Sequence, residues 1–233
     1  MIYFLLVRSR WNTLLLIGLI LSCITLAEYS AIISDKLLHY IQQKYGTSAE
    51  KRVVKWQDIM RNNKNDSDWG KLNMVNNFFN KIPYETDLDH WKKYDYWATP
   101  IEMIATNGGD CEDYAIGKYF TLRELGIPIE KLRISYVIEL TVNQPHMVLA
   151  YYETPDSDPL ILDNIKGRIT PASGREDLQP VYSFNGDGLW TAQERGNELK
   201  QDVGNVFSWQ DLNERMVTEM NNASNWNTAA GSN

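Results

Sequence analysis

The 233-residue sequence predicts a single α+β domain in which helices come first and an antiparallel sheet follows. Up to about residue 128, apolar residues recur at the spacing of amphipathic helices. Beyond that point they alternate with polar residues, as in half-buried strands, and turn signals such as DSD and NGDG separate the apolar segments. The sequence contains no internal repeat, so one core shared by both halves is expected.

The first third of the chain predicts three helices that form a scaffold and show no chemistry of their own. They are expected at residues 28–46 with Gly46 as C-cap, at 48–65 with Ser48 as cap, and at 68–82, closed by Pro83. The aromatic segment that follows, YETDLDHWKKYDYWATP, is expected to form turns.

The segment GGDCEDYA predicts that a fourth helix begins at Cys111. Asp110 is expected as its N-cap and Asp113 at the third helical position, where a carboxylate stabilises a helix start. Ala115, Tyr119, Leu122 and Leu125 are expected to face the core. Gly126 is expected to end the helix.

The second half predicts strands at 131–140, 146–153 and 159–164, with a fourth near 181–184. A last helix is expected at 207–220, and the Asn-rich residues 221–233 are expected to form a flexible tail. The expected domain therefore spans residues 28–220.

Residues 1–27 have the pattern of an export leader. Arg8 and Arg10 precede the apolar stretch LLLIGLIL, and Thr25 and Ala27 fit the small positions before a cleavage site. The alternative is an uncleaved membrane anchor, because the segment is close to the length of a spanning helix. Either reading predicts a periplasmic location, and cleavage would leave Cys111 as the one cysteine of the mature chain.

The composition argues against a nucleic-acid partner. The formal net charge is −7, and no Lys/Arg-rich run or basic stripe is present. Aromatic residues make up 12% of the chain, which supplies ample apolar surface for a packed core.

Cys111, His146 and Asp163 occur in the order of a cysteine nucleophile, its base and the residue that orients the base. The imidazole would accept the thiol proton, and the carboxylate would fix the orientation of the ring. Neighbouring antiparallel strands can place His146 beside Asp163, with the helix start at the sheet edge. Each residue alone also has an ordinary structural reading: a small buried thiol, a strand-end histidine and a turn aspartate.

The acidic residues around Cys111 pose an electrostatic question. A carboxylate about 6 Å from a thiolate opposes it by roughly 2–3 kcal/mol at an effective dielectric near 20, more than a helix terminus returns. From the local sequence, Asp110, Glu112 and Asp113 read either as helix-capping groups or as ligands for a cation. A bound divalent cation would reverse the local field.

The segments YWATPIEMIATNGGDCEDYAIGKYF, HMVLAYY and LILDN together resemble the bacterial transglutaminase-like cysteine proteinases, and within them the LapG-type periplasmic enzymes. The resemblance implies a papain-like, transglutaminase-like fold with Cys111 as nucleophile, His146 as base and Asp163 as orienter. It also implies calcium dependence, with Asp110 and Glu112 at ligand positions and Asp113 as a further candidate.

The same resemblance implies a substrate and a partner. Enzymes of this type cut a large surface adhesin near its N-terminus, between paired alanines, and an inner-membrane cyclic-di-GMP receptor sequesters them. Cleavage releases the adhesin and promotes biofilm dispersal. The last six residues of the sequence include Thr228-Ala229-Ala230-Gly231, the same context, which is either a chance match or a segment that docks in the enzyme's own cleft.

Two other functions use the same residues. A transglutaminase or acyl transferase would share the thioester chemistry and differ only in the acceptor. A non-catalytic calcium-binding module would keep the fold without turnover. Near the thiol, Gly108 and Gly109 are expected to clear space for a substrate backbone, and Trp97 to serve either as a hydrogen-bond donor or as a core residue.

Overall fold

A computed structural model describes residues 34–191 and 207–229. The expected leader and the cleavage or anchoring of residues 1–27 lie outside the described residues, as do residues 230–233 of the tail. Within the described ranges, no helix combines the length and the apolar character needed to cross a membrane.

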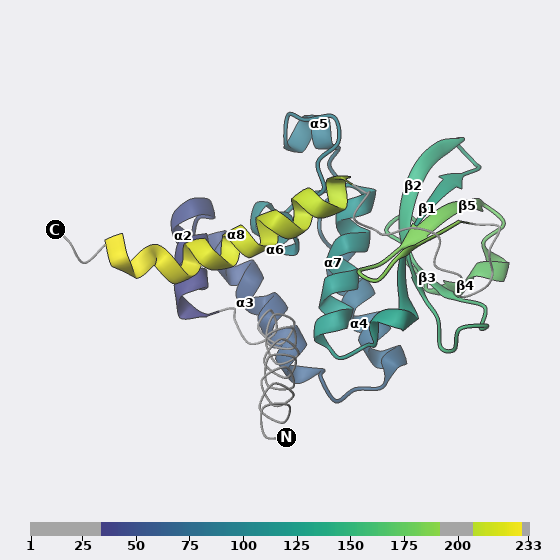
Figure 1. Ribbon diagram of the computed structural model, residues 1–233, viewed down its shortest axis with the longest axis horizontal. Coiled ribbons are helices and arrows are strands. Elements are labelled where there is room, and N and C mark those ends of the chain that lie inside the picture. Colours follow the sequence, from purple (N-terminus) through teal and green to yellow (C-terminus); the bar gives the residue numbers. More distant parts are fainter. Residues whose placement is uncertain (1–33, 192–206, 230–233) are drawn as a thin grey trace, which may run out of the picture.

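The molecule has a central helix, α7, with the sheet on one side and the other helices gathered on the opposite side and around its ends (Figure 1). This arrangement confirms the α+β class with an antiparallel sheet. The helices are α2 (Asp35–Tyr45), α3 (Thr47–Asn62), α4 (Asp68–Phe79), α5 (Asp87–His90), α6 (Pro100–Thr106), α7 (Cys111–Glu124) and α8 (Phe207–Ala229).

The first three helices form near their predicted positions, and their ends follow the capping chemistry. Ser34 caps α2 by accepting the Leu37 N–H, and Gly46 ends it with a positive φ of 88°. The helix α3 begins at Thr47 with Gly46 as its N-cap and no side-chain cap, so the expectation that Ser48 would cap it was wrong. Ser67 caps α4 in the same way as Ser34 caps α2.

The short helix α5 lies inside the segment that was expected to form turns, so this expectation was wrong there, and a second short helix, α6, begins at the last residue of the segment. The reason is local capping: Thr99 accepts the Glu102 N–H, Glu102 accepts the Thr99 N–H, and Pro100 occupies the first helical position. All three residues are buried, so tertiary packing adds to these local signals.

The six strands form one antiparallel sheet in the order β4-β3-β2-β1-β5-β6. Central pairing between β1 and β2 places Val137 opposite His146. The short strands β4 and β6 lie at the two edges and were not expected from the sequence. The six strands are β1 (Leu132–Glu139), β2 (Gln144–Tyr151), β3 (Leu160–Leu162), β4 (Thr170–Pro171), β5 (Leu178–Phe184) and β6 (Leu189–Thr191). Two short 3-10 helices are η1 (Ile129–Lys131), before β1, and η2 (Ala172–Gly174), between β4 and β5.

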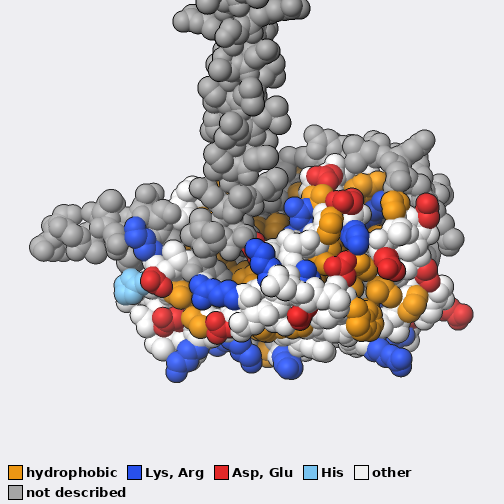
Figure 2. All heavy atoms as spheres, turned by 90° about the horizontal axis from the view of Figure 1, so that it is seen from below, with side chains coloured by type: hydrophobic (Ala, Val, Ile, Leu, Met, Phe, Trp, Pro, Cys, Tyr) orange, Lys and Arg blue, Asp and Glu red, His pale blue; other side chains and the backbone are white. Residues whose placement is uncertain are grey.

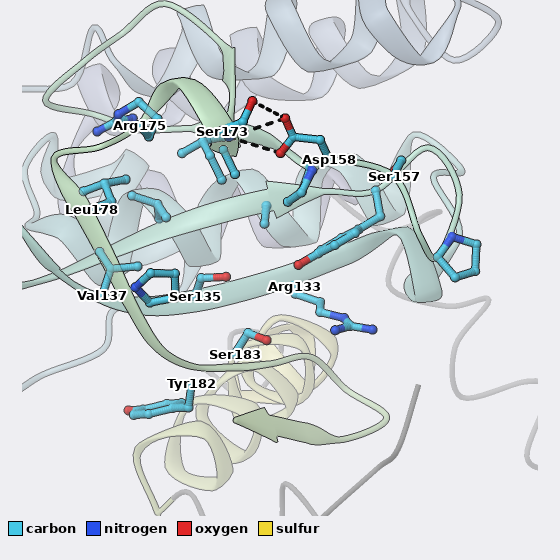
Figure 3. Close-up of a pocket in the computed structure, with 18 of the residues that line it drawn as sticks. Arg133, Ser135, Val137, Ser157, Asp158, Ser173, Arg175, Leu178, Tyr182 and Ser183 are labelled. Carbon is cyan, nitrogen blue, oxygen red and sulfur yellow. Dashed lines mark hydrogen bonds between the residues drawn. The ribbon is translucent and has the colours of Figure 1, made fainter. Parts of the chain in front are cut away.

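The two faces of the sheet have different neighbours. The inner face packs on the helices through residues such as Ile134, Leu149 and Phe184, which belong to the main core. The outer face carries a small separate apolar cluster of Val137, Val148, Ala150 and Ile161. A pocket of about 600 Å³ lies over this cluster, with Arg133 and Arg175 on opposite sides of it (Figure 3).

The last helix, α8, begins at Phe207 as expected but continues to Ala229, where a flexible tail was expected from residue 221. The residues between 221 and 229 include no proline or glycine, so no helix breaker occurs before Gly231. Arg215 fastens α8 to the rest of the fold: its Nη1 lies 2.6 Å from Glu102 Oε2. The helix also packs against α2 near the start of the described chain.

The surface mixes charges of both signs. On the face shown in Figure 2, the Lys, Arg, Asp and Glu side chains of the described residues are interspersed with apolar ones, and no continuous basic band crosses that face.

Candidate active site

Cys111 occupies the first position of α7, as the sequence predicted, and Asp110 is the N-cap residue. The helix packs against β2, and a hydrogen bond from the backbone of Met147 reaches the Cys111 sulfur. Because Met147 directly follows His146, this contact places the thiol alongside the strand that carries the predicted base. The thiol is partly buried and donates to Glu112 Oε2 at 3.0 Å.

His146 and Asp163 are in direct contact, as the strand order predicted. His146 Nε2 lies 2.9 Å from Asp163 Oδ1, and the two side chains are 4% and 0% exposed. Asp163 also accepts the Ile165 N–H at 2.9 Å, and its backbone carbonyl accepts from Asn80, the C-cap residue of α4. The ring is therefore held through Nε2, which leaves Nδ1 as its other proton-exchanging atom.

Asp163 is ionised despite its burial. Burial alone would raise the pKa of this carboxyl group, but the hydrogen bond and charge of His146 oppose it, together with the Ile165 N–H and Arg175. The balance lowers the pKa of Asp163 to about 2. A buried anion therefore faces the imidazole across the pH range in which proteins function.

Three carboxylates beside the thiol form a group that fits a metal ion. Asp87, Asp110 and Glu112 each offer an oxygen, and these oxygens lie within 4.8 Å of one another. Asp87 Oδ1 and Asp110 Oδ1 are buried and have no hydrogen-bond partner within the described part of the chain. Buried carboxylate oxygens without partners are costly, and a hard cation would satisfy them.

The sequence identified two members of this group and missed the third. Asp87 begins α5, 24 positions before Cys111, and accepts the Tyr96 N–H through its other oxygen. No local pattern connects these two positions, because only the folded chain brings them together.

Asp113, the further metal candidate, does not join the group. Its Oδ1 accepts the Ala98 N–H at 2.6 Å, and its Oδ2 accepts the Asp110 N–H at 3.3 Å. Both oxygens therefore bind backbone groups and hold the loop before α7 against the helix start, which is the capping role that the sequence also allowed.

The cluster is strongly unfavourable for negative charge. Burial raises the pKa of the Cys111 thiol far above its usual range, and the charge and hydrogen bond of Glu112 raise it further, followed by the charge of Asp110. The pKa of Asp110 is raised to about 10, first by burial and then by Glu112 and Asp113. Burial likewise raises the pKa of Asp87 to about 6. With no cation present, the thiol is protonated.

The two glycines before Asp110 are required by the protein's own packing. A Cβ on Gly108 would lie 2.7 Å from the His90 ring, and one on Gly109 would lie 2.6 Å from Asp113 Oδ2. Trp97 takes the core role rather than the donor role near the thiol: its indole N–H donates to Asp95, and its ring stacks on Phe184.

Tyr84 borders the site and was not expected from the sequence. It pairs with Gly109 in an isolated parallel bridge and is 57% exposed. The pKa of Tyr84 is raised to about 12, first by partial burial and then by the charges of Asp110, Cys111 and Glu112. An exposed aromatic ring therefore lies at the rim beside the thiol.

Comparisons with known proteins place the chain in a family. Residues 42–176 match the family model described as bacterial transglutaminase-like cysteine proteinase BTLCP. A solved structure of Legionella pneumophila LapG is 44% identical, with a TM-score of 0.69, and the match covers 78% of this chain and 96% of that one. No curated protein sequence matches the chain.

Two further solved structures of the Legionella protein are similar to this chain at 46% identity and a TM-score of 0.69. The EGTA-treated form matches 77% of this chain and 97% of its own. The calcium-bound form matches 77% of this chain and 98% of its own.

Proposed function

Since the chain belongs to the bacterial transglutaminase-like cysteine proteinases, we propose that it is a calcium-dependent endopeptidase with Cys111, His146 and Asp163 as its catalytic triad. The transglutaminase-like fold class expected from the sequence is confirmed by the same matches. The observation that supports the triad is the buried pair of His146 on β2 and Asp163, directly after β3, together with Cys111 at the start of the helix α7 that packs on β2.

The proposed reaction follows from which atoms are engaged. His146 Nε2 is bound to Asp163, so Nδ1 takes the proton from the Cys111 thiol. The sulfur attacks the peptide carbonyl carbon, the amine product leaves with the proton returned by His146, and a thioester remains. Water activated by the same imidazole then hydrolyses the thioester and releases the acid product. The Cys111 N–H, at a position with no intrahelical acceptor, donates to the developing oxyanion.

Asp87, Asp110 and Glu112 are the residues that would hold calcium. Their carboxylate oxygens suit a hard cation, and backbone carbonyls and waters would complete its usual six to eight ligands. When bound, calcium would neutralise the negative field that opposes thiolate formation at Cys111. Support comes from the two partnerless oxygens of Asp87 and Asp110 and from the calcium-bound form of the Legionella relative.

The proposed substrate is the N-terminal region of a large surface adhesin, cut in the periplasm between paired alanines. The proposed partner is an inner-membrane cyclic-di-GMP receptor that sequesters the enzyme, so that cleavage and biofilm dispersal follow when the second messenger falls. Support comes from the likeness to LapG and from the leader pattern of residues 1–27.

The test is cleavage of a defined substrate. The protein lacking residues 1–27 is incubated with the N-terminal fragment of a large adhesin encoded in the same genome, in calcium and in EGTA. We expect one new cut between alanines in calcium, at least about 100-fold less cleavage in EGTA, and none with Cys111→Ala. Equal cleavage by Cys111→Ala would refute the proposal, and incorporation of an added amine in place of hydrolysis would assign an acyl transferase.

A further inference from the structure

A buried arginine lies directly behind the Asp163 carboxylate. Arg175 follows the turn η2 at the edge of the outer-face pocket, and its side chain is 4% exposed. Its Nη2 donates to Asp163 Oδ2 at 2.7 Å, while Asp163 Oδ1 accepts from His146 and Ile165. Both oxygens of the carboxylate are therefore fixed by hydrogen bonds.

Arg175 is itself held in place. Its Nε and Nη2 donate to Asp177 at 3.0 Å and 2.8 Å, and Lys166 Nζ lies 3.0 Å from the same carboxylate. Lys166 is 54% exposed, so alternating charges lead from His146 through Asp163, Arg175 and Asp177 to the surface. A guanidinium held by two hydrogen bonds to Asp177 has little rotational freedom, so the direction of the single hydrogen bond from Nη2 to Asp163 is fixed as well.

We propose that Arg175 is a positioning residue for the reaction and acts through Asp163: it fixes the carboxylate in the one orientation that binds His146 Nε2 and turns Nδ1 toward the thiol. The inference rests on the proposed function of the triad. Without Arg175, Asp163 Oδ2 would be a buried oxygen with no donor, and the carboxylate could rotate away from the ring. No contact of Arg175 with substrate is required.

A purely structural role predicts something different. In that case Arg175 would contribute only to folding, through Asp177 and the outer sheet face, and its loss would lower stability without a specific effect on turnover. Arg133 provides a matched control, because it lines the opposite side of the same pocket (Figure 3). Arg133 stacks on Tyr152 and Trp190, 4.9 Å and 4.2 Å from the ring centres.

The experiment measures kcat and KM on the adhesin fragment in calcium for four proteins: wild type, Arg175→Gln, Arg175→Lys and Arg133→Gln. We expect Arg175→Gln to lower kcat by about 10–100-fold with KM within about twofold, because orienting partners act on turnover. Arg175→Lys retains a charge and should recover part of the loss. Arg133→Gln should keep kcat within about twofold of wild type.

A double-mutant cycle identifies the route of the effect. If Arg175 acts through Asp163, then Arg175→Gln should cost less than about twofold in an Asp163→Asn background. Equal losses in both backgrounds would overturn the proposal, as would wild-type kcat for a folded Arg175→Gln protein. If Arg175→Gln does not fold, the test rests on Arg175→Lys, whose single ammonium group cannot reproduce the guanidinium contacts with both Asp163 and Asp177. An unchanged kcat in a folded Arg175→Lys protein then overturns the proposal, as does an equal loss in the Asp163→Asn background.

The outcome for wild type separates this inference from the proposed function. If wild type shows no Cys111-dependent cleavage, the triad itself is wrong and the inference fails with it. If wild type cleaves and Arg175→Gln cleaves at the same rate, the triad stands and only the role of Arg175 is wrong.

Discussion

At the scale of single residues, Cys111 illustrates how burial and charge combine. The sequence showed the three neighbouring acids but could not show that desolvation is the first cause of the raised thiol pKa. Glu112 is the second cause, since its carboxylate accepts the thiol hydrogen at 3.0 Å. The same carboxylate belongs to the group that fits a cation, so it has opposite effects on the thiol with and without metal.

Glu112→Gln should therefore change reactivity in two directions. In EGTA, removal of the charge should speed iodoacetamide alkylation of Cys111 by at least about 10-fold at pH 8, because loss of an adjacent negative charge should lower the thiol pKa by at least about one unit. In calcium, the variant should bind the metal more weakly and cleave more slowly than wild type. Alkylation is followed by intact mass. Slower alkylation in EGTA would contradict the electrostatic account, and Glu50→Gln, far along the chain on α3, is the control.

Lys118 is a second residue whose charge is opposed by its surroundings. It lies on α7 with 1% exposure, and burial lowers its pKa to about 7, against an attraction from Asp163. Between about pH 7 and its ordinary pKa of 10.5, the unfolded chain holds a proton that the folded chain has released. Stability should therefore rise with pH across this window.

Lys118→Met should remove this dependence and stabilise the protein at pH 7 by about 2–5 kcal/mol. Urea unfolding at pH 7 and pH 10 measures the free energy of unfolding, and the difference in this quantity between wild type and Lys118→Met should shrink as pH rises. Lys36 is exposed on α2, so Lys36→Met is the control and should leave the free energy of unfolding unchanged at both pH values. The ammonium nitrogen lies 5.8 Å from the centre of the Tyr114 ring, so a loss of stability at pH 7 would show that this contact and the attraction of Asp163 outweigh the cost of burying the charge.

At the scale of secondary-structure elements, α7 depends on its close approach to α4. A Cβ placed on Gly117 would lie 2.3 Å from the ring of Phe79, which is fully buried. The approach fixes how deeply α7 sits between the helices and the sheet, and with it the position of the helix start at Cys111.

Gly117→Ala should destabilise the protein by about 1–3 kcal/mol, although alanine is the better helix former, because the ring of Phe79 must be displaced. Gly70→Ala on α4 is the matched control: its new Cβ meets its nearest neighbours at 3.4 Å, so a gain of up to about 1 kcal/mol is expected. Thermal unfolding of both variants measures the contrast. Equal changes in stability for the two substitutions would mean that helix propensity, and not the contact with Phe79, determines the effect of Gly117→Ala.

The elements that could be predicted are those with a periodic apolar face or a clear cap. Helices α2, α3, α4 and α7 and strands β1 to β3 meet these conditions and form close to their expected positions. The helix α6 carried a readable signal, the Thr99-Pro100-x-Glu102 capping box, which was overlooked. The edge strands β4 and β6 are two and three residues long and exist only through pairing with β3 and β5, so no local pattern announces them.

The same distinction holds for the site. His146 and Asp163 could be paired from chain order and strand alternation, and the structure brings them into contact. The sequence could not assign Asp87 or Arg175 to the site. Asp87 approaches Asp110 and Glu112, and Arg175 approaches Asp163, through tertiary contacts that have no fixed spacing in sequence.

At the scale of the whole molecule, buried polar contacts join α8, near the C-terminal end, to the start of α6 in the middle of the chain. Glu219 accepts the Thr99 hydroxyl at 2.9 Å, and Arg215 pairs with Glu102. Burial raises the pKa of Glu219 to about 8, with a further contribution from the charge of Glu102. Between its ordinary pKa of 4.5 and about 8, the folded protein therefore holds a proton that the unfolded chain has lost.

Stability should consequently fall as pH rises from about 5 to 8, by about 2–5 kcal/mol from this group. Glu219→Gln keeps an acceptor for Thr99 without the charge, so it should flatten the decline. Urea unfolding at pH 5, 6.5 and 8 measures the slope, and Glu214→Gln, exposed on the same helix, is the control. An unchanged slope in Glu219→Gln would assign the decline to other groups.

The packing of α8 on α2 also has a practical consequence for handling the protein. The two helices nearest the ends of the described chain lie together on the side of α7 opposite the sheet (Figure 1). An affinity tag, a fluorophore or a surface linkage attached before α2 or after α8 would therefore lie on the same side of the molecule, opposite the sheet. Immobilisation by either end should leave the outer sheet face, with its pocket, presented to the solution.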